Sequence, residues 1–178
     1  MEHRTPEYMA INPQGLVPAL IEEDGSIYTQ SLAMIEYLDE AYPQPPLLPK
    51  DMKERAYVRA ISQIIGCDIH PLNNVRVLKY LRTQYGLTEQ TTNDWYRHWI
   101  AEGFRALEAT LARERRFGQF CLGDNVTMAD ICLVPQVANA KRFSCDLSDF
   151  PITTEIAEAA EELEPFKAAH PSTQADAF

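Results

Sequence analysis

Residues 16–38 read LVPALIEEDGSIYTQSLAMIEYL and combine two short strand patterns with one helix pattern. The two strand patterns are apolar or β-branched runs on either side of Asp24-Gly25, a dipeptide typical of a tight hairpin turn. The helix pattern begins at Ser31, where apolar side chains start to recur at helical spacing, and Pro43 stops it. This stretch therefore predicts the order strand, strand, helix.

The chain changes character after residue 42. Residues 43–49 hold four of the twelve prolines, so we interpret residues 43–50 as an extended linker. Apolar stripes at helical spacing then continue nearly to the C-terminus. The predicted fold class is α/β plus all-α, with an α/β domain over residues 1–42 and an all-helical domain over residues 51–178.

Three features of the helical part predict local structure. Pro71 interrupts the first apolar stripe, which predicts a kink or a restart near His70. Gly103 in the second stripe allows two helices to approach closely. Thr127 and Asp130 form a capping-box variant, with Asp where Glu or Gln is usual, and we assign them to structure only.

Composition and charge exclude several classes of protein. A content of 46% hydrophobic and 24% charged residues fits a globular protein with a core. No apolar run approaches the roughly 20 residues that span a bilayer, and the N-terminus lacks a signal-peptide core. The net charge of -10 argues against nucleic acid and anionic membrane surfaces as partners. We expect a cytoplasmic protein that binds neither.

The cysteines indicate neither a disulfide framework nor a metal site. The four cysteines contain no C-x-x-C pair, so reduced and mostly buried thiols are expected. Cys67 and His70 have the spacing of a metal-ligand pair. A structural zinc site needs a second pair, which the sequence lacks. We therefore expect no metal.

Four blocks of the sequence together resemble the zeta class of the glutathione transferase family. The blocks are NPQGLVPAL (12–20), QSLAMIEYL (30–38), GCDIHPLNN (66–74), and TMAD (127–130) with VPQVANA (134–140). The first two blocks resemble the glutathione-binding half of the family. The last two narrow the match to the zeta class. The resemblance implies an incomplete thioredoxin-like N-terminal domain, a glutathione-transferase-type all-helical C-terminal domain, and a homodimer.

The resemblance implies glutathione as cofactor, with Val17, Gln30 and Ser31 among the residues that bind it. In this family the Val-Pro peptide is cis, which would turn the Val17 main chain toward solvent, where it could pair with the extended tripeptide. The alternative is a tight turn and nothing more. Gln30 and Ser31 fall where a helix N-terminus favours an anion, here the γ-glutamyl carboxylate. The alternative is that Ser31 is simply an N-cap.

The middle helix is the second place where the resemblance assigns roles. In the family it borders the substrate cleft. The resemblance implies that His70 and Asn74 contact glutathione and that His70 is a candidate for moving a proton. It also implies that Arg76 binds a substrate carboxylate through its planar guanidinium. On an ideal helix His70 and Asn74 are neighbours at i, i+4. The alternative for His70 is a satisfied histidine preceding a proline.

The activity implied is isomerisation of maleylacetoacetate to fumarylacetoacetate, a small keto-diacid of tyrosine and phenylalanine catabolism. Glutathione thiolate adds to the cis double bond, the single bond rotates, and elimination regenerates glutathione. The family's activating Ser/Cys motif belongs to a strand–helix–strand unit that we expect ahead of residue 1. The catalytic hydroxyl is then outside this chain, and an inactive fragment is one possibility.

Three other functions stay open. Isomerisation of maleylpyruvate in aromatic-acid breakdown differs only in the keto-diacid. A non-catalytic binding module of the same fold would show glutathione affinity without turnover. Conjugation of halogenated small acids would consume glutathione.

Overall fold

The computed structural model describes residues 2–175, so the outer ends of the two predicted domains, residue 1 and residues 176–178, lie outside the described residues. The chain divides into two compact units. The first unit ends at Leu48 and the second begins at Pro49. This division falls inside the linker predicted over residues 43–50.

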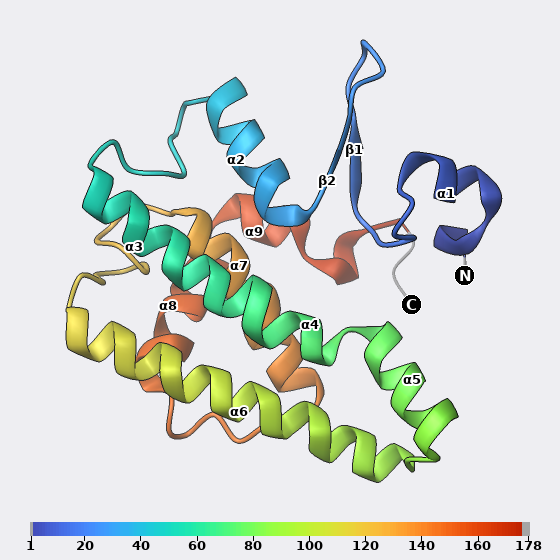
Figure 1. The fold of residues 1–178 in the computed structure, drawn as a ribbon. Coiled ribbons are helices and arrows are strands. Elements are labelled where there is room, and N and C mark those ends of the chain that lie inside the picture. Colours follow the sequence, from blue (N-terminus) through green and yellow to red (C-terminus); the bar gives the residue numbers. More distant parts are fainter. Residues whose placement is uncertain (1, 176–178) are drawn as a thin grey trace. The chain divides into compact units, whose positions relative to one another are not determined.

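The first unit is a small α/β unit (Figure 1). After a 3-10 turn its elements are α1 (Pro6–Ile11), β1 (Ala19–Ile21), β2 (Ile27–Thr29) and α2 (Ser31–Ala41). The strands pair antiparallel, with Leu20 opposite Tyr28. The predicted hairpin and helix are confirmed, and α2 contacts β2 through a stack of Tyr28 on Tyr37 whose ring centroids lie 4.1 Å apart.

The sequence did not predict α1. Thr5 caps this helix with a side-chain oxygen that accepts from the Tyr8 N–H, and Pro6 occupies the first helical position. Both features are typical of helix starts. With only six residues, however, α1 is too short for an apolar period to show in the sequence.

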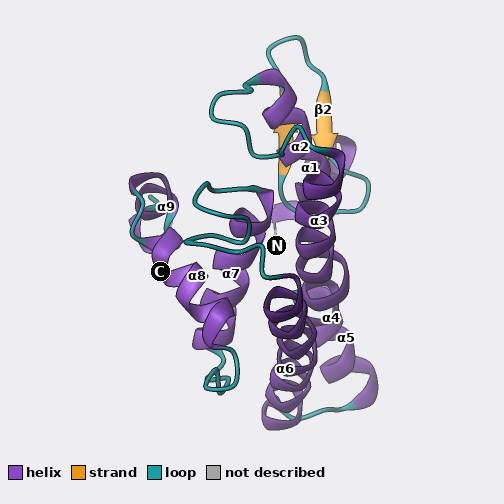
Figure 2. Cartoon of the chain, turned by 90° about the vertical axis from the view of Figure 1, so that its left-hand side faces the viewer, coloured by secondary structure: helices purple, strands orange, loops and turns teal. Residues whose placement is uncertain are grey.

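Helices make up the second unit (Figure 2). They are α3 (Met52–Gln63), the π-helical segment η2 (Ile64–Ile69), α4 (His70–Asn73), α5 (Val75–Tyr85), α6 (Glu89–Glu114), α7 (Met128–Arg142), α8 (Pro151–Glu161), α9 (Glu164–Ala169) and a final 3-10 turn η3 (Pro171–Thr173). Among residues 2–175, no helix is both long enough and apolar enough to cross a membrane.

The core of the second unit forms around α6. Its side chains Ile100, Phe104 and Leu107 are completely buried. A Cβ atom on Gly103 would overlap the Ile69 side chain, so the predicted close approach of two helices is confirmed, between α6 and η2.

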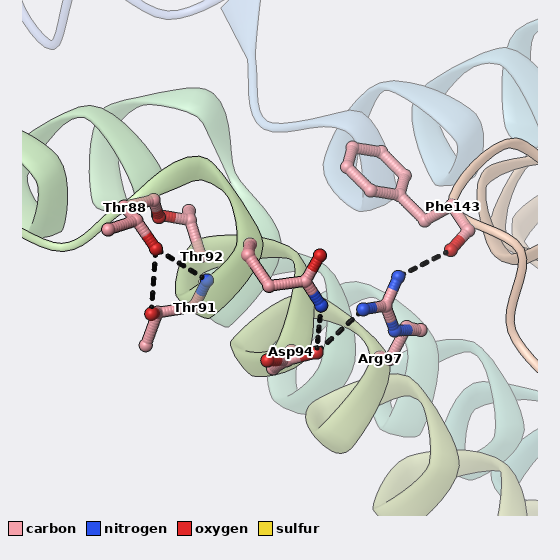
Figure 3. Close-up of polar contacts among 7 residues, drawn as sticks. Thr88, Thr91, Thr92, Asp94, Arg97 and Phe143 are labelled. Carbon is pink, nitrogen blue, oxygen red and sulfur yellow. Dashed lines mark hydrogen bonds and ion pairs between the residues drawn. The ribbon is translucent and has the colours of Figure 1, made fainter.

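Two polar contacts fix α7 at its ends. At the start, Asp130 Oδ2 accepts from the N–H and the hydroxyl of Thr127, at 2.7 and 2.8 Å, which confirms the predicted capping box. At the end, Arg97 donates to the Phe143 carbonyl at 3.3 Å while it also pairs with Asp94 (Figure 3). The Phe143 ring also stacks on Tyr96, with centroids 3.6 Å apart.

Candidate functional site

The segment before β1 presents an unused peptide edge. Val17 is 68% exposed, and its bond to Pro18 is cis. Among residues 2–175 the main-chain N–H and C=O of Val17 have no hydrogen-bond partner. Such a free edge can pair with an extended peptide in the manner of an added strand.

The structure of the α2 N-terminus excludes the alternative that Ser31 is the N-cap. The N-cap is Gln30, whose carbonyl accepts the Met34 N–H at 3.0 Å, and Ser31 is the first helical residue. The idea that Ser31 is the N-cap is therefore wrong. The Gln30 side chain makes no capping hydrogen bond either, and its amide nitrogen donates to Gln14 Oε1 at 2.7 Å.

This uncapped helix start suits an anion. The first N–H groups of a helix have no partner within it, and here no side chain caps them and no acidic residue occupies the first turn. The helix dipole adds positive potential at the same place. Gln30 has a φ of 73°, a conformation that costs free energy in a non-glycine residue and is often found at ligand sites. A carboxylate fits this position.

The hairpin register brings the peptide edge and the anion position to the same end of the first unit. Ala19 pairs with Thr29, Val17 lies two residues before that pair, and Ser31 lies two residues after it. An extended ligand with a terminal carboxylate could therefore contact both. This arrangement fits glutathione, a peptide with an α-carboxylate on its γ-glutamyl end.

His70 begins α4, directly after the π-helical segment. Its N–H donates to the Ile65 carbonyl, five residues back, and the helix continues with Pro71 at its second position. The restart predicted near His70 is confirmed, and the wider turn accommodates a proline that has no N–H. Although His70 lies at an exposed position, nearby protein atoms desolvate the ring and lower its pKa below 6.5.

The helix that contains His70 ends at Asn74, which differs from the continuous helix expected from the sequence. The φ of -62° and ψ of 142° at Asn74 are extended, so His70 and Asn74 are not i, i+4 neighbours on one helix. Asn can cap a helix, and Asn74 Oδ1 accepts the Arg76 N–H at 3.1 Å as the N-cap of α5. Arg76 is exposed, and its guanidinium has no partner among residues 2–175. It is available to an acidic ligand.

The structure also shows residues that the sequence did not single out. Gln14 and Asn12 contribute side-chain bonds around Gln30 and Leu16, and Tyr8 contributes a third. The NPQG block contained Asn12 and Gln14 and was a usable signal for them. Tyr8 had none, because its contact depends on how α1 packs against the following segment.

The described residues offer no cluster of three His, Cys, Asp or Glu side chains that could hold a metal. The thiols differ in their surroundings. Burial raises the pKa of Cys132 to about 11 and that of Cys121 well above 9.0, whereas Cys67 is exposed. The thiols of Cys121 and Cys132 are therefore protonated at neutral pH.

Comparison with known proteins identifies the family. Residues 1–46 match the model of the glutathione S-transferase N-terminal domain, and residues 93–164 match that of the C-terminal domain. Maleylacetoacetate isomerase of Mus musculus is 46% identical over 97% of this chain and 76% of its own length.

Two solved structures extend the similarity to the fold. One is the holo structure of a maleylpyruvate isomerase, a bacterial zeta-class enzyme, with 46% identity, a TM-score of 0.96, and coverage of 99% of this chain and 83% of that one. The other is maleylacetoacetate isomerase of Methylobacterium extorquens AM1 with bound malonate and GSH, with 38% identity, a TM-score of 0.96 and the same coverage.

The chain therefore belongs to the glutathione S-transferase family, as its four sequence blocks predicted. Within that family its similarity is to the zeta class. The expected fold, a thioredoxin-like first unit and a glutathione-transferase-type helical second unit, is confirmed.

Proposed function

We propose that this chain is a glutathione-dependent cis–trans isomerase of a small keto-diacid, and that it converts maleylacetoacetate to fumarylacetoacetate. The observation that supports this most is the similarity, at a TM-score of 0.96, to a maleylacetoacetate isomerase solved with malonate and GSH. Malonate is a small dicarboxylate, as a keto-diacid substrate would be.

Residues of the first unit would bind glutathione. The free main chain of Val17 supports pairing with the peptide, and the uncapped start of α2 at Ser31 supports binding of the γ-glutamyl carboxylate. Gln30 would contribute its amide. His70 and Asn74 stay proposed contacts, the latter through the amide nitrogen that capping leaves unused.

When bound, glutathione supplies a sulfur nucleophile that adds reversibly to the cis double bond and leaves unchanged from the trans product. The chain's own residues would bind and orient the keto-diacid. The unpaired guanidinium of Arg76 offers two parallel donors to a carboxylate. His70, whose pKa is lowered by desolvation, is the candidate for moving a proton. No residue of this chain is assigned as the activating group for the thiol.

Maleylpyruvate is the second candidate substrate. It is favoured by the 46% identity to a zeta-class maleylpyruvate isomerase over 99% of this chain. Both substrates carry carboxylates that Arg76 could bind. Measured turnover of each one would therefore decide which is the substrate.

We propose further that the protein is a cytoplasmic homodimer. Its four cysteines are free thiols, which suits a reducing compartment. The dimer is what the resemblance to the glutathione transferase family implies. Light scattering should give a mass twice 20.2 kDa; a mass of one chain would contradict the dimer.

Kinetics with both keto-diacids tests the proposed function. Ser31→Ala should raise the KM for glutathione about threefold to tenfold, the cost of one hydrogen bond. Arg76→Ala should raise the KM for the diacid about tenfold or more, because a charged hydrogen bond is lost. The matched controls are Ser148→Ala and Arg142→Ala, at exposed positions on other elements. Glutathione affinity without turnover would favour a binding module instead, and loss of glutathione would favour conjugation.

A further inference from the structure

We propose that Tyr8 and Asn12 are positioning residues for glutathione, because together they fix the direction in which the Val17 N–H points. This inference rests on the proposed function, since it concerns the same ligand. Neither side chain is expected to touch glutathione itself. Their effect would pass through a single peptide unit.

Both side chains donate to one acceptor, the main-chain carbonyl of Leu16. Tyr8 Oη and Asn12 Nδ2 each lie 2.7 Å from that oxygen. Asn12 is only 3% exposed, and its Oδ1 accepts the Gln14 N–H at 3.1 Å. A carbonyl oxygen has two lone pairs, so two short donors fix its orientation.

Peptide geometry carries this orientation to Val17. The Leu16 carbonyl and the Val17 N–H belong to one planar trans unit, in which the two groups point in opposite directions. Because the carbonyl points toward Tyr8 on α1, the Val17 N–H points away from α1. The N–H has no partner among residues 2–175, so it is available to an extended peptide.

Close packing keeps this segment in place against α1, which lies beside it (Figure 1). Gly15 has a φ of 57°, and a Cβ there would lie 2.8 Å from Met9 Sδ and 2.9 Å from Arg4 Nη1. The loop between α1 and β1 is thus closely packed at Gly15. A peptide edge held in its binding orientation loses less entropy when the ligand binds.

The test compares Tyr8→Phe, which removes only the hydroxyl, with Tyr42→Phe. Tyr42 is 66% exposed and its hydroxyl has no partner among the described residues. Calorimetry should show the Kd for glutathione rising about threefold to tenfold in Tyr8→Phe and staying unchanged in Tyr42→Phe. The KM for glutathione should rise by the same factor, while kcat and the KM for the keto-diacid stay at their wild-type values.

A second readout reports on Val17 directly. In wild-type protein, saturating glutathione should slow hydrogen exchange of the Val17 amide, and the protection should be weaker in Tyr8→Phe at the same glutathione concentration. An unchanged Kd and unchanged protection in Tyr8→Phe, with Ser31→Ala still weakening binding, would overturn the positioning role and leave the proposed function standing. Failure of the wild-type protein to bind glutathione would overturn both.

Discussion

Replacing Asp130 with Ala should destabilise the protein more than any surface change. The Asp130 side chain is completely buried and accepts three hydrogen bonds. Two come from the N–H and hydroxyl of Thr127, and the third comes from the Cys121 N–H at 2.8 Å. The carboxylate thus joins the start of α7 to the loop before it.

The expected cost follows from what the substitution leaves behind. Without the carboxylate, the Thr127 and Cys121 N–H groups are buried without acceptors, at about 1–3 kcal/mol each. The interaction of the charge with the α7 N-terminus is lost as well, typically about 0.3–1 kcal/mol. Together these losses predict a decrease of about 2–7 kcal/mol in the free energy of unfolding. Thr127→Val should cost about 1–2 kcal/mol, and the double variant less than the sum, because the two residues share bonds.

Urea unfolding followed by tryptophan fluorescence measures this effect, since both tryptophans lie on α6 in the same unit. The matched control is Asp149→Ala, at an exposed aspartate in the loop before α8, with an expected change below about 0.5 kcal/mol. If Asp130→Ala cost no more than Asp149→Ala, the account of α7 as a helix fixed by a buried carboxylate would be wrong.

Three further predictions concern the helical unit. Gly103→Ala should lower the free energy of unfolding by about 1–3 kcal/mol, because the added Cβ overlaps Ile69; an unchanged urea midpoint would refute this. A thiol reagent at pH 8 should modify Cys67 well before Cys132, whose pKa burial raises to about 11, and mass mapping of the labelled peptides checks the order. Burial also raises the pKa of Tyr96 to about 12. The unfolded phenol ionises first as pH rises from 10 to 12, so the Tyr96 contribution to stability should fall there; a smaller alkaline drop in Tm for Tyr96→Phe tests the assignment.

Sequence patterns predicted the elements whose structure depends on residues near one another in the chain. The Asp24-Gly25 turn, flanked by strand patterns, gave the hairpin, and Thr127 with Asp130 gave the start of α7. The break at Asn74 was not predicted, because helical spacing does not show where an Asn side chain binds the main chain and starts a new helix. Whether a helix continues or ends at such a residue depends on whether its side chain replaces a main-chain carbonyl as hydrogen-bond acceptor.

The sequence named candidate site residues but did not predict how they lie in space. The motif placed Val17 and Ser31 in the binding half, and the hairpin register then shows that both lie at one end of the sheet. The positive φ of Gln30 could not be foreseen, since glycine is the usual residue for that conformation. The bond from Tyr8 to the Leu16 carbonyl spans eight residues of chain, and only the packed structure reveals it.

We expect this chain to isomerise a keto-diacid with glutathione as a cofactor that is not consumed. Proton NMR of one sample containing the protein, glutathione and the cis keto-diacid measures both molecules at once, with samples lacking protein or glutathione as references. Vinyl signals of the trans acid should replace those of the cis acid faster than in either reference, while the glutathione signals keep their intensity. No acceleration over the references, or loss of glutathione in step with the acid, would contradict it.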